Sequence, residues 1–268
     1  MKTVAIAGFG AIGKVLAKRL LTGKHGFELS IIGARDAAKT AADVERVLQR
    51  KIPVVVSNEL AGRADVLLEC VPTPAFRAVV EPALQAGMTV ITVSGAALLD
   101  HMDLEQVAAK HGGRLILATG AILGLDAMRA ARIGTIHSVH MITRKPPKSL
   151  ATAKHVVEQG MDLHKIEAAT LLFKGTAREA ARQFPANVNV AAAVALASCG
   201  PDRMTIEIWT DPKVERNTHT VVVDADTARL EVEIANVPSD DNPGTGKITA
   251  LSMLAALERL NAPLVVGT

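Results

Sequence analysis

Aromatic residues are scarce in this sequence, which contains no tyrosine, one tryptophan and five phenylalanines among 268 residues. The absence of tyrosine excludes every mechanism in which a tyrosine hydroxyl is the general acid, and with it the tyrosine-dependent short-chain dehydrogenases. The shortage of aromatic rings also argues against a surface on which nucleic-acid bases stack. Acid–base chemistry must therefore come from histidine, lysine or carboxylate side chains.

Cysteine and excess charge are scarce as well. The two cysteines, Cys70 and Cys199, are too few for a disulfide framework and lack the spacing of a metal site. Thirty Lys and Arg residues against 27 Asp and Glu leave a formal net charge of +3, which argues against a surface that grips polyphosphate. We therefore expect a cytoplasmic protein with no metal site and no nucleic-acid partner.

Long apolar runs are also missing. The uncharged stretch from Phe184 to Pro201 opens with a polar Asn-Val-Asn segment, and its continuous apolar part is too short to span a bilayer. The apolar N-terminus is interrupted by glycines and has no small-residue cleavage site, so it does not read as a signal peptide. With 49% hydrophobic and 21% charged residues, the chain is expected to form a compact core away from membranes.

The first 120 residues alternate short β-branched runs with amphipathic stretches, which is the pattern of βαβ units. This alternation predicts an α/β fold with an N-terminal Rossmann domain, a doubly wound parallel sheet covered on both faces. The expected strands are TVAIAG, FELSII, IPVVV, ADVLLEC, MTVITV and RLILA, and the expected helices lie at 11–21, around 44–48, and at 74–85 and 104–110.

After Gly120 the pattern changes to alternating apolar and polar residues in MTIEIWT, HTVVVDA and ARLEVEIA. Such strands bury one face, so residues 121–244 are predicted to form an α+β second domain with a mostly antiparallel sheet. A hairpin turn is expected at 224–227, with helices at 177–184 and after Asn189. The C-terminal segment 245–268 carries a helix at 248–260 that is expected to return to the first domain.

A glycine-rich segment joins the first predicted strand to the first helix and matches the dinucleotide pattern G-x-G-x-x-G in the right context. Its first glycine allows a tight turn, the second lets the backbone approach a pyrophosphate, and the third allows close helix–strand packing. A glycine turn without a ligand is the alternative. The expected cofactor-binding residues here are Gly8, Gly10, Ala11, Ile12 and Gly13.

The end of the second strand leaves the choice between NAD and NADP open. A carboxylate there usually binds the ribose hydroxyls, whereas a basic residue accommodates a 2′-phosphate. This chain has Arg35 followed by Asp36, so Arg35 is a candidate cofactor-binding residue, and the pair could equally be a solvated loop.

Four further positions stand out in the rest of the chain. His219 follows Arg-Asn-Thr at the start of a predicted strand, where it could face the cleft between the domains. Asn187 and Asn189 interrupt an apolar segment; Asn189 suits a helix N-cap, and Asn187 needs polar partners that a nicotinamide carboxamide would supply. Ala121 lies in the TGAILG segment that follows the last parallel strand, near the edge where such folds bind ligands.

Six segments spread over nearly the whole chain resemble the L-aspartate dehydrogenase family of the NAD biosynthesis type. They are GFGAIG at the N-terminus, TGAILGLDA between the domains, TRKPP at 143–147, FPANVNVAAAVALA at 184–197, RNTH ending at 219, and DNPGTGKITALS at 241–252.

The resemblance implies a two-domain homodimeric enzyme that oxidises L-aspartate to iminoaspartate with NAD or NADP. Iminoaspartate then feeds quinolinate synthesis, in pyridine nucleotide biosynthesis, or hydrolyses to oxaloacetate and ammonia. The second domain would carry the substrate, the catalytic residue and the dimer contact. By the resemblance His219 is the active-site residue, and Ala121 and Asn187 contact the cofactor.

The proton of the substrate ammonium needs an acceptor, and we expect His219, with a pKa near neutrality, to take it. The two substrate carboxylates need cationic or N–H donors. The candidates for that role are Asn189, Arg144, Lys145, Thr245 and Lys247.

Two other functions are also consistent with the sequence. A two-domain reductase of the dihydrodipicolinate or homoserine type would share the domain plan and act on another amino-acid derivative. A non-catalytic dinucleotide sensor would bind the cofactor and a protein partner, and would not need His219.

Overall fold

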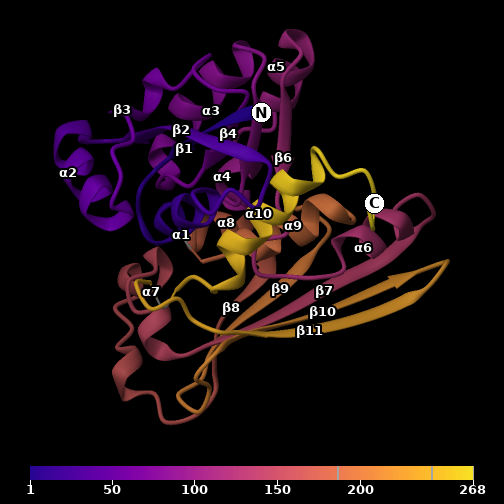
Figure 1. Ribbon diagram of the computed structural model, residues 1–268. Helices are drawn as coiled ribbons and strands as arrows, with labels where there is room; N and C mark the ends of the chain where they lie inside the picture. Colours follow the sequence, from indigo (N-terminus) through magenta and orange to yellow (C-terminus); the bar gives the residue numbers. More distant parts are fainter. Residues whose placement is uncertain (186, 243, 268) are drawn as a thin grey trace. The chain divides into compact units, whose positions relative to one another are not determined.

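The structure is a computed structural model that describes residues 1–185, 187–242 and 244–267 (Figure 1). Ala186 of the FPANVN segment, Pro243 of DNPGTG and the terminal Thr268 lie outside the described residues. The chain forms two compact units. The first contains Met1–Ser94, Asp100–Ala118 and Thr249–Leu264, and the second contains Gly95–Leu99, Thr119–Ile248 and the chain from Val265 onward.

The sheet of the first unit has six strands, all parallel, in the order β3-β2-β1-β4-β5-β6. The doubly wound parallel sheet expected from the alternating pattern is thus confirmed, and the strand order changes direction between β1 and β4. The strands are β1 (Lys2–Ala7), β2 (Phe27–Ala34), β3 (Val54–Val56), β4 (Val66–Glu69), β5 (Thr89–Thr92) and β6 (Arg114–Leu117).

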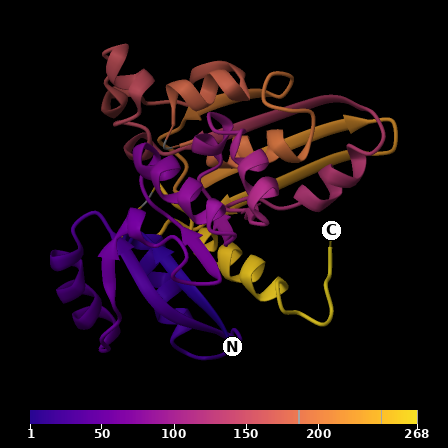
Figure 2. The same ribbon diagram turned by 90° about the horizontal axis from the view of Figure 1, so that it is seen from above.

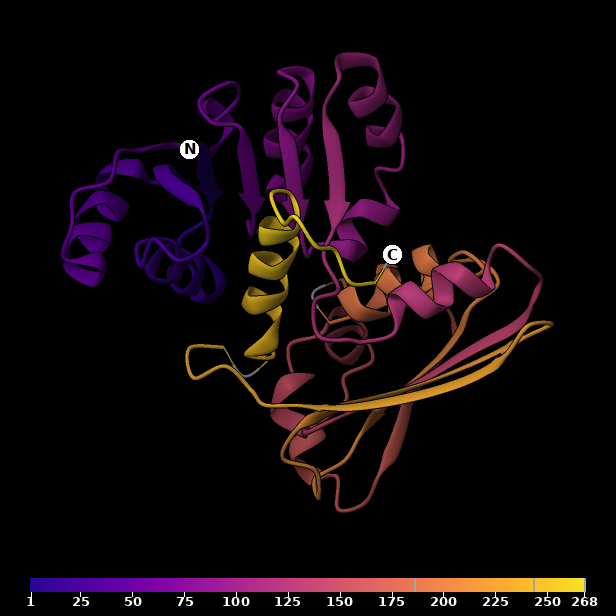
Figure 3. The same ribbon diagram turned by 45° about the vertical axis from the view of Figure 1, so that its right-hand side comes forward.

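Helices cover this sheet and bury its apolar side chains. Leu16, Ala17 and Leu20 of α1 recur at helical spacing and pack with the strands, and Met253 and Leu257 of α10 join the same cluster. In Figure 3 α10, drawn in yellow, lies beside the strands. The helices of the first unit are α1 (Ala11–Leu20), α2 (Ala37–Leu48), α3 (Phe76–Gln85), α5 (Leu104–His111), α10 (Ile248–Arg259), and the 3-10 turns η1 (Ser57–Glu59) and η2 (Thr73–Ala75).

The sheet of the second unit has five strands in the order β11-β10-β7-β9-β8. Three of its four pairings are antiparallel, as expected, but β7 and β9 run parallel. The predicted hairpin joins β10 to β11, which extend together in Figure 1. The strands are β7 (Ile136–Lys145), β8 (Thr170–Thr176), β9 (Thr205–Thr210), β10 (Asn217–Ala225) and β11 (Arg229–Asn236).

Helices α6, α8 and α9 lie on one face of this sheet (Figures 2 and 3). The strands alternate buried and accessible residues, so each turns one row of side chains toward those helices. The helices of the second unit are α4 (Gly95–Leu99), α6 (Leu125–Ala131), α7 (Lys154–Glu158), α8 (Ala177–Gln183), α9 (Asn189–Ala197), and the 3-10 turns η3 (Pro147–Ser149) and η4 (Leu163–Lys165).

Candidate active site

The three glycines of the loop after β1 differ in what surrounds them. Gly8 has φ +98°, and a Cβ there would lie 2.6 Å from the carbonyl oxygen of Cys70. A Cβ on Gly13 would overlap the carbonyl oxygen of Gly8. A Cβ on Gly10, by contrast, would meet nothing within 4 Å. Packing therefore explains the first and third glycines, and the open space at Gly10 fits a ligand that approaches the backbone.

Helix α1 begins at this loop, and the N–H groups of its first turn have no partner within the helix itself. Gly10 is the N-cap, supplies no side-chain cap, and the first turn contains no acidic residue. Ala11 and Ile12 are the first helical residues, so their backbone N–H groups lie at the positive end of the helix dipole. The pyrophosphate of a dinucleotide fits this arrangement.

The end of β2 offers a cation and keeps its carboxylate occupied. Asp36 is the N-cap of α2, and its side chain accepts a hydrogen bond of 3.0 Å from the backbone N–H of Lys39. Arg35 is exposed beside it.

A buried carboxyl group at the ends of β4 and β5 was not expected from the sequence. Glu69 accepts hydrogen bonds from the Thr92 hydroxyl at 2.5 Å and from the Val71 N–H at 2.8 Å. Burial raises the pKa of Glu69, although these hydrogen bonds oppose the rise. Burial and the charge of Glu69 raise the pKa of the neighbouring Cys70 thiol, and this side chain packs against the core.

In the second unit, the inward face of the sheet changes from apolar to polar along the strands. At one end it carries Val221 and Val223 on β10 with Met141 on β7, all buried. At the other end, beside the buried Ile208 of β9, it carries a group of buried polar side chains: Asn217 and His219 on β10, Thr143 and Lys145 on β7, Thr210 on β9 and Asn236 on β11. Buried polar side chains gathered at one place are typical of a functional site.

His219 is the third residue of β10 and is 3% exposed. Its Nδ1 lies 3.0 Å from the hydroxyl oxygen of Thr143, its partner in the strand register. Burial, and then the charge of Lys145, lower the pKa of His219 to about 3. The expectation of a pKa near neutrality is therefore wrong for this structure, because the imidazole is enclosed next to an ammonium group and stays neutral.

Lys145, the last residue of β7, is 3% exposed. Its Nζ donates a hydrogen bond of 2.9 Å to the backbone carbonyl of Asn187. Burial lowers the pKa of this lysine to about 8. The sequence indicates that Lys145 faces inward, because it lies at the spacing of two residues that Val139, Met141 and Thr143 follow along β7.

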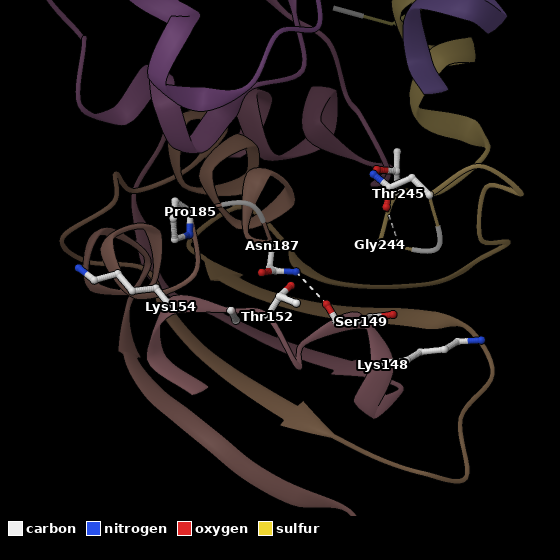
Figure 4. Close-up of a pocket in the computed structure, with 10 residues that line it drawn as sticks. Lys148, Ser149, Thr152, Lys154, Pro185, Asn187, Gly244 and Thr245 are labelled. Atoms are coloured by element: carbon white, nitrogen blue, oxygen red, sulfur yellow. Dashed lines mark hydrogen bonds between the residues drawn. The ribbon is translucent and has the colours of Figure 1, made fainter. Parts of the chain in front are cut away.

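A pocket of about 470 Å³ lies beyond the end of β7 (Figure 4). The side-chain amide of Asn187 donates a hydrogen bond of 3.1 Å to the carbonyl of Ser149 in its wall. Lys148 and Lys154 point away from Asn187 in opposite directions (Figure 4). The pocket is lined by Lys148, Ser149, Thr152, Ala153, Lys154, Pro185, Asn187, Asn242, Gly244 and Thr245.

The other residues predicted to bind the substrate carboxylates do not all lie at this pocket. Thr245 lines the pocket. Arg144 lies on the opposite face of β7 from Lys145, where it stacks on Trp209 with Cζ 5.2 Å from the ring centre. Lys247 forms an ion pair of 2.9 Å with Asp240 at the surface. The structure thus brings Lys145, His219, Asn187 and Thr245 into one region and leaves the other two cations outside it.

Asn189 does not cap its own helix, contrary to expectation. The N-cap of α9 is Val188, and the side-chain oxygen of Asn189 accepts a hydrogen bond of 3.1 Å from the N–H of Ala96 on α4. The side-chain oxygen that was expected to cap the helix therefore binds a residue far away in the sequence. Ala121 is buried, and its carbonyl accepts a hydrogen bond of 3.0 Å from the Asn236 side chain.

Two searches of the described residues concern other functions. Across residues 1–185, 187–242 and 244–267, no three or more His, Cys, Asp or Glu side chains are grouped so as to hold a metal ion. Within the same ranges no helix has the length and apolar character needed to span a membrane.

Two family profiles cover most of the chain. The profile described as "Aspartate dehydrogenase, C-terminal" matches residues 126–260, and the one described as "Homoserine dehydrogenase, NAD binding domain" matches residues 8–118.

Full-length relatives and a solved structure resemble the chain. An L-aspartate dehydrogenase of Bradyrhizobium diazoefficiens is 48% identical over 99% of this chain and 94% of its own length. L-aspartate dehydrogenase 3 of Bordetella bronchiseptica is 46% identical over 99% of this chain and 97% of its own. The crystal structure of an aspartate dehydrogenase from Thermotoga maritima shares the fold, with a TM-score of 0.75 and 24% identity over 100% of both chains.

Proposed function

This chain belongs to the L-aspartate dehydrogenase family, and we propose that it oxidises L-aspartate to iminoaspartate. It is an NAD(P)-dependent oxidoreductase that acts on a CH–NH2 group. The observation that carries the assignment of its site is the polar end of the second unit's sheet, where a buried imidazole and a buried ammonium stand side by side.

The residues of that region have separate roles in binding and orienting the substrate. When bound, the nicotinamide supplies the redox chemistry by accepting a hydride. Thr143 holds Nδ1 of His219, which leaves Nε2 as the ring atom to contact the substrate nitrogen. The hydroxyl of Thr245, which lines the pocket, suits a carboxylate of aspartate.

The cofactor would be held by backbone groups in the first unit. Gly8, Gly10 and Gly13 shape the loop, and the N–H groups of Ala11 and Ile12 would bind the pyrophosphate. We further propose that NADP is accepted as well as NAD, which the exposed cation at the end of β2 supports. The motif resemblance supports Ala121 and Asn187 as cofactor contacts.

The test is to incubate the purified protein with L-aspartate and NAD or NADP and to follow the absorbance of the reduced nicotinamide. L-Homoserine is the matched control substrate, because the N-terminal profile is described by that activity. Turnover of L-aspartate above L-homoserine supports the proposal. Turnover of homoserine alone would favour the reductase reading, and cofactor binding without turnover would favour the sensor.

His219→Asn tests the site within that assay. The change should lower kcat by on the order of a hundredfold, because a positioned acid–base or hydrogen-bonding side chain contributes that much or more, while cofactor affinity stays within about twofold. Unchanged turnover at saturating L-aspartate would contradict the assignment of His219.

The family resemblance also supports three proposals about context: a homodimer, a cytoplasmic location, and delivery of iminoaspartate to quinolinate synthesis in NAD biosynthesis. Light scattering of the purified protein tests the first. A monomeric mass at micromolar concentration would contradict it.

A further inference from the structure

The two ionisable groups of the polar region have fixed relative positions. Thr143 and Lys145 are two residues apart on β7 and therefore point to the same face of the sheet. His219 pairs with Thr143 in the register, and its Nδ1 contacts the Thr143 hydroxyl at 3.0 Å. The imidazole and the ammonium thus occupy adjacent places on one buried face.

Lys145 is enclosed without a counter-ion. Its Nζ makes one hydrogen bond, to the carbonyl of Asn187, and forms no ion pair with any carboxylate of the described residues. Thr210, its register partner on β9, is fully buried, and its hydroxyl has no hydrogen-bond partner in the described parts of the chain. An ammonium has three N–H donors, so this environment leaves it under-satisfied until a ligand arrives.

The buried environment of Lys145, which offers its ammonium no ion pair among the described residues, lowers the pKa of the side chain. His219 on β10 is a titratable group on the same face, and its lowered pKa keeps it neutral. Asp211 follows Thr210 at the end of β9, but its carboxylate accepts the N–H of Lys213 and lies 3.9 Å from Arg144. Burial alone accounts for the lowered pKa of Lys145, about 8, because no neighbouring carboxylate stabilises the charged form.

We propose that Lys145, as the neutral amine, accepts the proton from the ammonium of the bound amino acid, while His219 stays neutral and orients the substrate nitrogen. An N–H bond of the substrate ammonium breaks, its electron pair remains on the substrate nitrogen, and a new N–H bond forms at Nζ. The lone pair of the resulting amine then forms the C=N bond as the Cα–H bond breaks and its electron pair leaves as hydride to the oxidised cofactor. The protonated Lys145 returns its proton to solvent. This inference rests on the proposed function.

Kinetics of three variants test the proton acceptor. Lys145→Arg keeps a positive charge that does not titrate in the accessible range, so kcat should fall at least a hundredfold at every pH from 6 to 10. In the unaltered protein kcat/KM should rise with pH, with a midpoint near 8. Lys165→Met removes an exposed lysine paired with Asp162 and should leave the profile unchanged. Lys145→Ala should recover activity when ethylamine is added, in proportion to its free-base fraction.

A titration of the ligand-free protein supplies a second readout that does not depend on activity. His219, observed by NMR with ¹³C-labelled histidine, should not titrate between pH 5 and 8 in the unaltered protein. Lys145→Met removes the neighbouring charge, so the pKa of His219 should rise in that variant.

The outcomes separate the two proposals. If the unaltered protein does not oxidise L-aspartate, both fail. If it does, and Lys145→Arg keeps turnover within threefold or the His219 titration is the same with and without Lys145, the proton-acceptor role fails and the proposed function stands. Loss of turnover with amine rescue and a shifted His219 titration supports the role.

Discussion

The buried charge of Lys145 should make the stability of the protein depend on pH in a window where few other groups interfere. Burial lowers the pKa of this lysine from 10.5 to about 8 in the folded state. The unfolded chain therefore binds more protons between those values, so stability rises with pH through this window. A depression of that size corresponds to about 3 kcal/mol of destabilisation at pH 7, which disappears above pH 10.5.

Lys145→Met isolates this contribution because methionine has a similar shape and no charge. The advantage of the variant in unfolding free energy over the unaltered protein should be greatest at pH 7. It should shrink by about 3 kcal/mol as the pH approaches 10.5. Subtracting the two curves cancels the titration of the other lysines and of the cysteines, and the sequence has no tyrosine to titrate there.

The assay is urea unfolding at a series of pH values, followed by fluorescence. The single tryptophan, Trp209, lies on β9 opposite Arg144 in the register, so its emission reports the sheet that contains Lys145. Lys165→Met is the control for loss of an exposed lysine and should run parallel to the unaltered protein. Parallel curves for Lys145→Met as well would refute the claim that this ammonium is buried without compensation. Failure of Lys145→Met to fold at pH 7 would refute it too.

Four further substitutions test the first unit. Gly10→Ala should leave the urea midpoint unchanged but weaken cofactor binding at least about tenfold, as measured by calorimetry. Gly13→Ala should lower the unfolding free energy by about 2 kcal/mol or more, because its Cβ would overlap backbone atoms. Equal effects of the two changes would contradict the inference that Gly10 is needed for a ligand. Glu69→Gln should lower the unfolding free energy by about 1–3 kcal/mol, measured by circular dichroism, because an amide donor then faces donors; no change would mean that the carboxyl does not hold the strand ends. Arg35→Glu should raise KM for NADP about tenfold or more and change KM for NAD much less; a parallel change would exclude a 2′-phosphate contact.

Local patterns in the sequence were enough to predict most of the fold. The six parallel strands, the hairpin between β10 and β11 and helices α8 and α10 each carry their own signal, because a strand or helix shows its buried face in its own periodicity. The glycine loop was equally readable, since G-x-G-x-x-G between a strand and a helix has few other uses.

The features that could not be predicted from the sequence depend on contacts between residues that are far apart along the chain. The parallel pairing of β7 with β9 and the placement of residues 95–99 in the second unit follow from tertiary packing. Asn189 bonds to Ala96, 93 residues away, where local reasoning saw only a helix cap. The low pKa of His219 likewise arises from enclosure beside Lys145, which no local pattern encodes.

The division of the second sheet's inward face into an apolar and a polar half ties activity to correct folding. Because side chains alternate along a strand, a slip of β10 by one residue would turn His219 outward and expose Val221 and Val223 at the same moment. A mispaired sheet would therefore lose its hydrophobic contacts and its imidazole together. The register that buries the two valines is therefore the same register that places the imidazole on the inward face.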